Sequence, residues 1–297
     1  MNGNFKSGFV AIVGRPNVGK STLVNSLVKQ KIVITSDKPQ TTRHKIRCVL
    51  NQENAQIVFI DTPGLHKPHD LLGKHLNEKV RSALKEVDAI LFLVDVSQVI
   101  GKGDTFIAKE ISKLDTPTIL VLNKMDKIGQ RYLSVQVEIG RDLDEFRSIV
   151  PISALNGKNL DVLVNETVKL LPEGPKYYPD DVITDQPEKL IIAEFVREKV
   201  LELTREEVPH SVMVKIENIS QREDKDIVDV EAYIFVERES QKGIVVGRGG
   251  KMLKGIGERA RLDIENLLGS QVFLNLWVKV KKKWRADKNV IRQMDEY

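Results

Sequence analysis

The chain has 297 residues, of which 41% are hydrophobic and 30% are charged, and its net charge is +4. This length is enough for two domains and the composition is that of a globular protein, which excludes fibrous and disordered classes. No apolar run approaches the roughly 20 residues of a membrane span, and the start MNGNFKSGFVAIVG lacks a signal-peptide pattern, so we predict a cytosolic protein. A single cysteine, Cys48, rules out an internal disulfide and a cysteine-based metal cage, and we expect a buried or inert thiol.

From Gly8 to about Leu171, short β-rich runs alternate with helical patterns. The runs are FVAIVG, AQIVFIDTPG, AILFLVDV, TILVLNKMD and SIVPISA, and the first helical pattern is KSTLVNSLV. This alternation is typical of an α/β fold, with a mostly parallel sheet and helices on both faces. Such sheets bind ligands at the carboxyl ends of their strands. We therefore expect a ligand site at that edge.

The segment GRPNVGKS, residues 14–21, follows the first β-run and opens the first helical pattern, which is the setting of a phosphate-binding loop. Glycines at both ends let successive N–H groups curl around a β-phosphate, where the helix N-terminus adds partial positive charge. Lys20 would reach the β- and γ-phosphates, and Ser21 would offer its hydroxyl to Mg²⁺. The flanking strand and helix disfavour a chance glycine turn. The predicted phosphate-binding residues are Gly14, Arg15, Pro16, Asn17, Val18, Gly19, Lys20, Ser21 and Thr22.

Two further segments are expected to contact the metal and the γ-phosphate. The tetrapeptide DTPG ends a β-run, so Asp61 can hold Mg²⁺ through a water and the N–H of Gly64 can sense the γ-phosphate. Thr41 and Thr42 lie in a polar stretch between the first helix and the next strand, and the sequence does not decide which of them closes onto Mg²⁺. Contacts made only with GTP would make both segments the moving parts. The catalytic set is Lys20, Thr42, Asp61 and Gly64, the metal set is Ser21, Thr41, Thr42 and Asp61, and Thr62 and Pro63 complete the nucleotide contacts.

The segment NKMD, residues 123–126, ends the run TILVL where a base would lie. The carboxylate of Asp126 can accept from both guanine N1–H and the N2 amine, whereas adenine lacks these donors and would leave the carboxylate unpaired. Asn123 would tie this segment to the phosphate loop, Lys124 would pack along the ring, and the N–H of Ala154 would donate to guanine O6. The sequence therefore predicts GTP and GDP as ligands. The base-site residues are Asn123, Lys124, Asp126, Ser153, Ala154 and Leu155.

A proline-rich stretch divides the chain. Four prolines in PEGPKYYPDDVITDQP interrupt any periodicity, so we predict a first domain at 1–172, a linker at 173–187 and a second domain at 188–297. The second domain should contain a helix (PEKLIIAEFVREKVLELT), two strands (SVMVKIENIS and DIVDVEAYIFVE), two helices around a glycine-rich turn, and a last strand (QVFLNLWVKV). Residues 181–241 hold 8 Lys and Arg against 16 Asp and Glu, whereas residues 242–292 hold 13 against 4. One end of this domain is therefore basic.

Between those two helices lies GRGG, residues 247–250, the GXXG loop that clamps single-stranded nucleic-acid backbone in KH domains. Glycines allow close backbone approach, the following helix N-terminus attracts phosphate, and nearby lysines and arginine add charge. Ile244 and Val245 could line a groove for splayed bases. The predicted RNA-binding residues are Ile244, Val245, Gly247, Arg248, Gly249, Gly250, Lys251, Lys254, Lys281, Lys282 and Lys283.

The basic cluster KVKKKWR, residues 279–285, admits three interpretations. It could bind phosphates and stack a base on Trp284. It could be a solvated strand end with Trp284 packed on the domain, or a segment that touches anionic lipid heads. The sequence does not choose between them.

The motifs GRPNVGKST, QTTRH, DTPG, NKMD and SAL, in this order, resemble those of the bacterial Era-type GTPases, and QKGIVVGRGGKMLKGIG is similar to their C-terminal type II KH domain. The resemblance covers nearly the whole chain. It implies Mg²⁺-dependent GTP hydrolysis, binding to the 3′ end of 16S ribosomal RNA, and assistance in small-subunit maturation. It also implies a cytoplasmic protein that associates in part with the inner face of the cell membrane. Several relatives with an asparagine at the position of Asn17 use potassium in place of an arginine finger.

Hydrolysis should be slow. Leu65 stands where Ras-like enzymes have a water-orienting glutamine, and a leucine has no hydrogen-bonding atom with which to align a water. This favours a switch over a metabolic catalyst. The alternative hypothesis is a signalling or cell-cycle GTPase with protein or membrane partners, in which the KH-like domain is only a scaffold. We expect a monomer.

Overall fold

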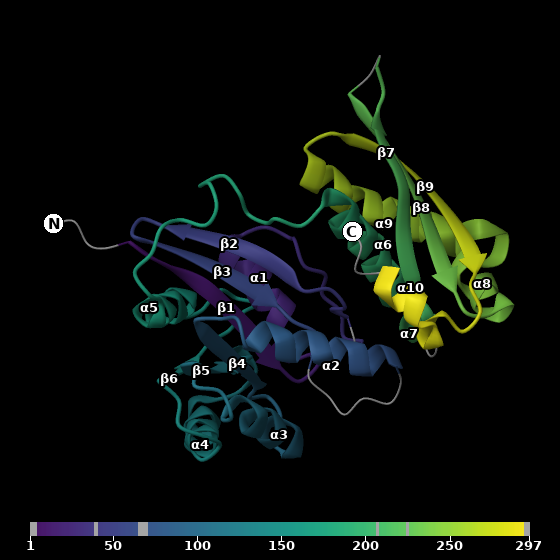
Figure 1. Cartoon of the computed structure of the whole chain (residues 1–297). Coiled ribbons are helices and arrows are strands. Elements are labelled where there is room, and N and C mark those ends of the chain that lie inside the picture. Colours follow the sequence, from purple (N-terminus) through teal and green to yellow (C-terminus); the bar gives the residue numbers. More distant parts are fainter. Residues whose placement is uncertain (1–4, 39–40, 65–70, 206–207, 224–225, 294–297) are drawn as a thin grey trace. The chain divides into compact units, whose positions relative to one another are not determined.

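The structure is a computed structural model that describes residues 5–38, 41–64, 71–205, 208–223 and 226–293. By packing, the chain divides into two units, which Figure 1 shows in different colours because colour follows the sequence. The first unit comprises Met1–Val33, Thr42–His69 and Gly73–Asp185. The second comprises Ile34–Thr41, Asp70–Leu72 and Gln186–Tyr297.

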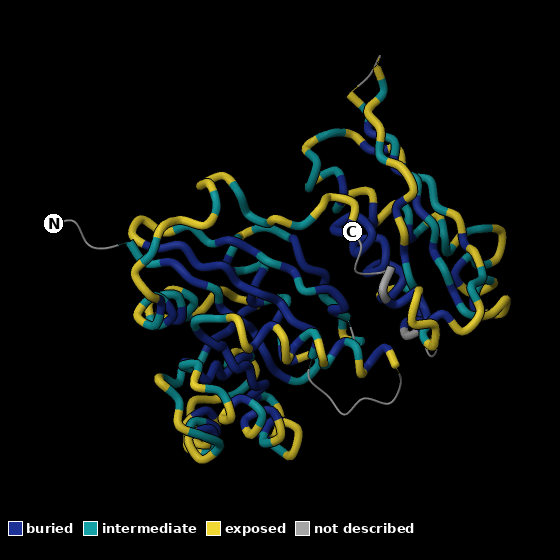
Figure 2. The backbone as a smooth tube through the Cα atoms, in the orientation of Figure 1, coloured by how far each residue is buried: buried dark blue, intermediate teal, exposed yellow. Residues whose placement is uncertain are grey.

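A six-stranded sheet forms the centre of the first unit. In spatial order its strands are β2 (Ile46–Gln52), β3 (Ala55–Asp61), β1 (Lys6–Gly14), β4 (Ala89–Asp95), β5 (Thr118–Asn123) and β6 (Ser148–Pro151). All neighbouring pairs are parallel except β2 and β3, which are antiparallel. Every residue of β3, β4 and β5 is buried, as expected for apolar parallel strands covered on both faces (Figure 2).

Helices cover both faces of this sheet (Figure 1). They are α1 (Lys20–Val28), α2 (Leu71–Leu84), α3 (Lys102–Ile111), α4 (Gln130–Arg141) and α5 (Leu160–Leu170), with a short 3-10 turn η1 (Met125–Lys127). Residues of α2, α3 and α4 form one hydrophobic cluster with alternate residues of β1, β4 and β5. The helices on the other face of the sheet include α1, which contacts β1, β2 and β3. The predicted α/β class is confirmed.

The second unit contains a three-stranded sheet with the order β7-β8-β9. Strands β7 (Met213–Gln221) and β8 (Ile227–Val236) are antiparallel, and β9 (Gln271–Val280) is parallel to β8. The helices are α6 (Glu188–Leu203), α7 (Val208–Ser211), α8 (Glu239–Val246), α9 (Lys251–Leu268) and α10 (Lys288–Gln293), with turns η2 (Arg248–Gly250) and η3 (Trp284–Ala286). This is the predicted order of elements. The short α7, η3 and α10 were not predicted, because four to six residues give too little periodicity.

The stretch that we predicted as a linker is partly packed on the first unit. The N–H of Val49 in β2 donates to the Ile183 carbonyl at 2.7 Å, and the guanidinium of Arg47 pairs with Asp185 at 2.8 Å. The amide of Gln56 in β3 donates to the Tyr178 carbonyl at 2.8 Å. Residues up to Asp185 therefore add backbone partners to the edge of the sheet.

The second unit also includes Ile34–Thr41, which lies within the range 1–172 that we predicted as one domain. The N–H of Thr35 donates to the Glu198 carboxylate of α6 at 2.8 Å. Arg197, also in α6, donates to the carbonyl of Thr41. The division between the units therefore falls between Thr41 and Thr42. Local sequence carries no sign of this packing, because the partners are more than 150 residues away.

Two expectations about single side chains are settled by burial. Cys48 is a free, fully buried thiol, and burial raises its pKa well above its usual range, so it is inert as expected. Trp284 is also fully buried, and its indole N–H donates to the Ser211 carbonyl at 2.8 Å. Of the alternatives for Trp284, packing on the domain is therefore correct, and stacking on a base is excluded.

None of the helices in the described ranges combines the length and apolar character needed to span a bilayer.

Trp284→Ala should lower the free energy of unfolding of the second unit by about 3–5 kcal/mol, because a buried indole is lost. Trp284→Phe should cost less, about 1–3 kcal/mol, mainly because the hydrogen bond from the indole N–H to the Ser211 carbonyl is lost. Trp277→Phe, at a site that is 41% exposed, is the control and should stay within about 0.5 kcal/mol. Both tryptophans of the chain lie in this unit, so tryptophan fluorescence in a urea titration reports its unfolding specifically. A loss for Trp284→Ala no larger than that of the control would contradict the burial.

Candidate functional site

The predicted nucleotide residues meet at one edge of the first unit's sheet. Strands β1, β3, β4 and β5 are parallel, so their carboxyl ends lie together. The phosphate loop joins β1 to α1, Asp61 ends β3, and Asn123 ends β5. Folding therefore brings together segments that are more than 100 residues apart in the chain.

Lys20 lies inside the phosphate loop. Its ammonium is buried and donates to the carbonyls of Gly14 at 3.2 Å and Arg15 at 2.9 Å. Burial lowers its pKa to about 8, although the charge of Asp61 partly opposes this shift. Carbonyl dipoles satisfy the ammonium only in part, so a phosphate would be a stronger partner at this place.

Asp61 is the hub of a cluster of oxygen atoms. Its Oδ2 accepts from the hydroxyls of Ser21 at 3.0 Å and Thr42 at 3.1 Å, and these two hydroxyls are 3.1 Å apart. Its Oδ1 is buried and has no hydrogen-bond partner. Carboxylate and hydroxyl oxygens are the ligands that Mg²⁺ prefers, so the cluster fits that ion. Thr41 lies outside the cluster and donates to the Lys38 carbonyl at 2.6 Å, so of the two threonines only Thr42 has the geometry of a metal ligand.

Burial also sets the ionisation of this carboxylate. Desolvation raises the pKa of Asp61 to about 6, even though the charge of Lys20 and the bonds from Ser21, Thr42 and Thr62 lower it. The charged form therefore costs free energy in the folded chain. A cation next to Oδ1 would remove that cost.

Asn123 ties three loops together. Its amide donates to the Val18 carbonyl at 2.8 Å and accepts from the N–H of Ala154 at 3.0 Å. A Cβ on Gly19 would lie 2.3 Å from the Asn123 amide nitrogen, and Gly19 has φ +102°, so only glycine fits there. The predicted tie between NKMD and the phosphate loop is present. Because the N–H of Ala154 already has a partner, its predicted bond to guanine O6 requires that this N–H be shared or exchanged.

The other base-site residues are arranged around an open position. Lys124 donates to the Asn17 carbonyl at 2.7 Å and pairs with Asp95 at 2.6 Å. Asp126 is exposed in the turn η1, so its carboxylate is accessible to a base. Ser153 is buried and Leu155 is exposed.

Sequence reasoning missed Asp95. Burial raises the pKa of this carboxyl, but hydrogen bonds from Lys124 and Ser97 outweigh that effect and hold it below its usual range. The carboxylate thereby fixes Lys124 beside the phosphate loop. Its place at the end of the run AILFLVD, at the same sheet edge as Asp61, is the signal that could have identified it.

The rest of the predicted nucleotide residues hold the loops in place. A Cβ on Gly64 would lie 2.9 Å from the nitrogen of Pro16, so the DTPG segment abuts the phosphate loop. The hydroxyl of Thr62 is buried and donates to the Ile12 carbonyl at 2.7 Å, which joins β3 to β1. Arg15 pairs with the buried Asp104 of α3 at 2.8 Å. Leu65 lies outside the described residues.

In the second unit, the GXXG loop has the geometry expected of a backbone clamp. Gly247, Gly249 and Gly250 have φ of +71°, +60° and +76°. A Cβ on Gly249 or Gly250 would meet nothing within 4 Å, so open space lies before them. Exposed positively charged residues surround the loop: Arg248, Lys251 and Lys254.

The prediction that Val245 lines a base groove is wrong, because its side chain is fully buried in the core. Ile244 is 48% exposed and stays a candidate. Adjacent residues of a helix point in different directions, and here the core takes up Val245 while Ile244 faces solvent.

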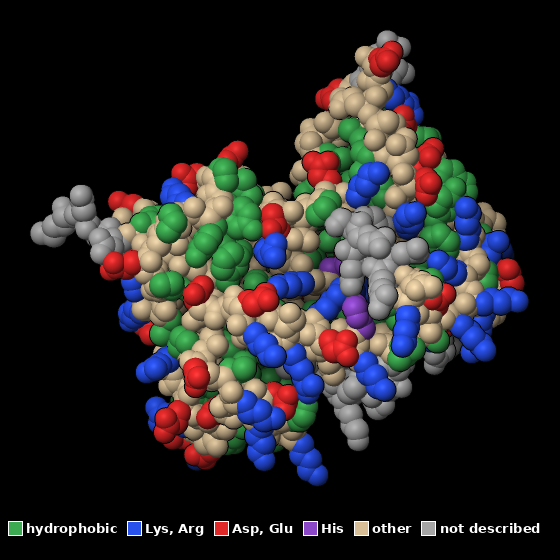
Figure 3. All heavy atoms as spheres, in the orientation of Figure 1, with side chains coloured by type: hydrophobic (Ala, Val, Ile, Leu, Met, Phe, Trp, Pro, Cys, Tyr) green, Lys and Arg blue, Asp and Glu red, His purple; other side chains and the backbone are tan. Residues whose placement is uncertain are grey.

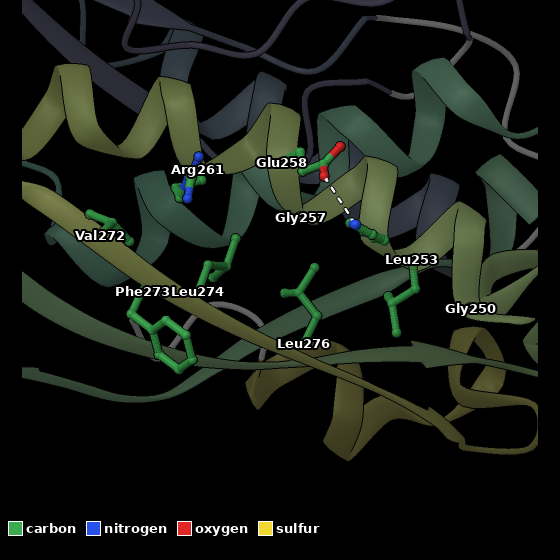
Figure 4. Close-up of a pocket in the computed structure, with 10 residues that line it drawn as sticks. Gly250, Leu253, Gly257, Glu258, Arg261, Val272, Phe273, Leu274 and Leu276 are labelled. Carbon is green, nitrogen blue, oxygen red and sulfur yellow. Dashed lines mark ion pairs between the residues drawn. The ribbon is translucent and has the colours of Figure 1, made fainter.

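The groove itself lies elsewhere, between α9 and β9, with a volume of about 400 Å³. Figure 4 shows Leu253, Leu274 and Leu276 pointing into it, and Glu258 paired with Lys254 at its rim. Gly257 is one turn beyond Leu253 on the same face of α9, which the i, i+4 spacing could have revealed. The lining residues are Gly250, Leu253, Lys254, Gly257, Glu258, Arg261, Val272, Phe273, Leu274 and Leu276.

The three lysines that follow β9 differ in how far their side chains are exposed to solvent. The backbone N–H of Lys281 donates to the Val236 carbonyl at 2.8 Å, and its side chain is half-buried. Lys282 and Lys283 are exposed, and Lys283 has φ +53° where the chain turns into η3. These two lysines are the part of the predicted basic cluster that an anion can reach.

Residues 9–124 match the family model described as "50S ribosome-binding GTPase", and residues 207–285 match the model described as "KH domain". GTPase Era of Alkaliphilus metalliredigens (strain QYMF) is 52% identical over 291 residues, which are 98% of this chain and 99% of that protein. The chain belongs to the GTPase Era family. GTPase Era of Alkaliphilus oremlandii (strain OhILAs) is 53% identical and is matched over 98% of both chains.

Era crystal structures share the whole fold. One is described as Era in complex with MgGDPNP and nucleotides 1506–1542 of 16S ribosomal RNA; its TM-score is 0.94, with 45% identity over 98% of both chains. An Aquifex aeolicus Era variant bound to GDP.AlF4− has the same score and identity, over 98% of this chain and 99% of that one. The expected Era-type architecture, a GTPase domain followed by a KH domain, is thus confirmed.

For this Era-family chain, Asp61→Asn should stabilise the nucleotide-free protein by up to about 3 kcal/mol at pH 8. The folded-state pKa of about 6 exceeds the ordinary 3.8, so the folded chain holds this proton more tightly; the charge destabilises the folded chain increasingly from pH 3.8 upward and fully above pH 6. The gain should vanish as the pH falls to 4. Thermal unfolding followed by circular dichroism at both pH values measures it, with the exposed Asp115→Asn as control. A gain that is equal at the two pH values would refute the assigned cause.

Asp126→Asn should weaken GTP binding at least about tenfold, because a carboxylate that accepts from two guanine donors is replaced by an amide. It should strengthen binding of xanthosine triphosphate, whose O2 can accept from the new amide. Competition between the two nucleotides against a fluorescent GDP measures this. Unchanged GTP affinity would show that the base lies elsewhere.

Proposed function

We propose that this chain is a slowly hydrolysing GTP switch that binds the 3′ end of 16S ribosomal RNA through its KH unit and assists maturation of the small subunit. The observation that carries the proposal is the cluster of Ser21, Thr42 and Asp61. Its member Thr42 directly follows the segment Ile34–Thr41, which belongs to the second unit. A ligand that moves Thr42 of the first unit would therefore also move Thr41, which belongs to the second unit.

Residues of the second unit continue this connection toward the GXXG loop. Glu198, which accepts from Thr35, is paired with Lys199 at 2.8 Å. Lys199 also pairs with Asp263 of α9 at 2.9 Å, and α9 begins directly after the GXXG loop. Burial lowers the pKa of Lys199, but its bonds to Glu198 and Asp263 outweigh this and raise it well above its usual range, so the ammonium stays charged. Nucleotide control of the RNA site would follow this path.

In the proposed reaction the chain's own residues position GTP. Lys20 binds the β- and γ-phosphates, the N–H of Gly64 senses the γ-phosphate, and Asp126 holds the base. Ser21, Thr42 and Asp61 would hold Mg²⁺, which supplies positive charge to the transferring phosphoryl group. With a leucine at position 65 no side chain there aligns the water, so hydrolysis is slow and the GTP state lasts. A further requirement for potassium near Asn17 stays a prediction.

The RNA half of the proposal rests on the open GXXG loop, the adjoining groove, and the likeness to an Era structure that is described as containing 16S ribosomal RNA nucleotides. We expect the chain in the cytoplasm. Contact with the inner face of the membrane is a prediction that draws on exposed Lys282 and Lys283.

Gly249→Asp should abolish most binding of single-stranded RNA, because a carboxylate is placed where phosphate approaches. Aspartate tolerates the positive φ of this position, so the unit should still fold. Gly129→Asp, at an exposed helix N-cap of the first unit with open space around it, adds the same charge as a control. Filter retention of a labelled RNA at about 150 mM salt, where non-specific attraction is weak, is the measurement. Equal retention by the two variants would reject the KH unit as the RNA site.

A further inference from the structure

Among the residues that the structure describes, the helices α6, α7, α8 and α9 make the main contacts with the sheet of the second unit, and they pack on one of its faces. Residues along β8 alternate strictly between half-buried and buried, and the buried set faces these helices. The opposite face, which we call the open face, carries four aromatic residues: Tyr233 and Phe235 of β8, and Phe273 and Trp277 of β9. Phe273 is 50% exposed and Trp277 is 41% exposed. Figure 3 shows hydrophobic side chains at the surface of this unit next to Lys and Arg.

Strand register places three of these rings, those of Tyr233, Phe235 and Trp277, in two adjacent rows. Lys215, Tyr233 and Trp277 form one row, and Met213, Phe235 and Lys279 form the next. The rings of Tyr233 and Trp277 are 5.5 Å apart, and those of Tyr233 and Phe235 are 6.1 Å apart. Rows two residues apart on a strand are separated by about 7 Å, twice the spacing of stacked bases, so the rings form a platform that two successive bases can reach.

Cations lie on this platform. The ammonium of Lys279 is 3.5 Å above the Tyr233 ring. The guanidinium of Arg222 is 5.1 Å above the Phe273 ring and is also paired with Asp229 at 2.6 Å, so Lys279 is the cation on which the argument depends.

The two rows contain two lysines and no carboxylate, whereas the next positions of β8 on this face are Glu231 and Asp229, so the part of the face that suits a phosphate is the end with Lys215 and Lys279. A phosphate drawn to Lys279 is thereby placed at the level of the rings, within one nucleotide of a base stacked on them. This charge and ring pattern complements single-stranded nucleic acid.

The open face adjoins the groove. Because β9 is the edge strand, its side chains alternate between the two: Leu274 and Leu276 point into the groove, whereas the ring of Phe273 points to the other side of β9 (Figure 4). A strand of RNA that leaves the groove can therefore pass over the free edge of β9 and reach the open face within a few nucleotides. We propose that the open face, centred on Tyr233, Trp277 and Lys279, is a second RNA-binding surface that stacks bases of the RNA whose backbone the GXXG loop holds. This inference rests on the proposed function.

RNA length separates the two surfaces. A KH groove takes about 4 nucleotides, so an oligonucleotide of about 6 should occupy the groove alone, whereas one of about 20 should reach both surfaces. Trp277→Leu and Tyr233→Leu, which keep apolar bulk and remove the aromatic face, should each weaken binding of the long RNA about tenfold and leave the short RNA unchanged. Trp277→Phe should restore most of the loss. Fluorescence anisotropy with the full-length chain in its GTP-analogue state measures these affinities.

Charge is tested separately. Lys279→Gln should reduce by about 1 the slope of log affinity for the long RNA against log salt concentration, which corresponds to the loss of one phosphate contact. Lys109→Gln, at an exposed lysine of the first unit, is the control and should leave this slope unchanged. The fluorescence of Trp284 verifies that each variant is folded, since its indole is buried in the same unit.

The outcomes differ for the two ideas. Wild-type affinity of Trp277→Leu and Tyr233→Leu for the long RNA would overturn the open-face inference, and loss of binding to phosphatidylserine vesicles instead would assign the face to membrane. Equal weakening of short and long RNA would also overturn it, because the groove alone would then be affected. If Gly249→Asp does not weaken binding of the short RNA, the proposed function is rejected. The open face would still be tested by the affinities of Trp277→Leu and Tyr233→Leu for the long RNA.

Discussion

A buried carboxylate with one unfilled oxygen, that of Asp61, is the constraint around which the nucleotide unit is built. Burial disfavours its charge, and the residues that partly relieve this cost come from separate segments: Lys20 and Ser21 from the phosphate loop and Thr42 from the stretch before β2. Such a site is unfavourable without a cation and favourable with one, so a bound cation would stabilise the arrangement in which these segments meet. This is how a small ion can control loops.

One peptide bond joins Thr42 to the segment Ile34–Thr41 of the second unit, and the proposed switch depends on this connection. Thr42 belongs to the first unit, whereas Ile34–Thr41 packs with α6 of the second through Arg197 and Glu198. A ligand shifts an equilibrium only by its differential affinity for the two states, and Thr42 is where such a difference can arise between GTP and GDP. The proposed control of the KH unit by the nucleotide therefore depends on a unit boundary that falls between Thr41 and Thr42.

The sequence predicted much of this because the motifs are local. GRPNVGKS, DTPG, NKMD and GRGG each need a particular backbone next to a strand or helix, so their roles follow from short context. What failed depended on distant packing. Val245 and Ile244 are equally apolar, and only the core decides which is buried; Trp284 looked available for RNA, but its N–H is bonded to Ser211, 73 residues earlier. Thr42, not Thr41, joins Asp61, and the groove between α9 and β9 needs a tertiary contact to exist.

Control of RNA binding by the nucleotide is the central claim, and one measurement bears on it directly. The affinity of the full-length chain for a fragment of the 16S ribosomal RNA 3′ end should be determined at one salt concentration, once with Mg²⁺ and a non-hydrolysable GTP analogue and once with Mg²⁺ and GDP. Coupling through Thr41 and Thr42 predicts binding about 5- to 150-fold tighter with the GTP analogue, the usual range for coupled sites. Equal affinities with the two nucleotides would contradict it.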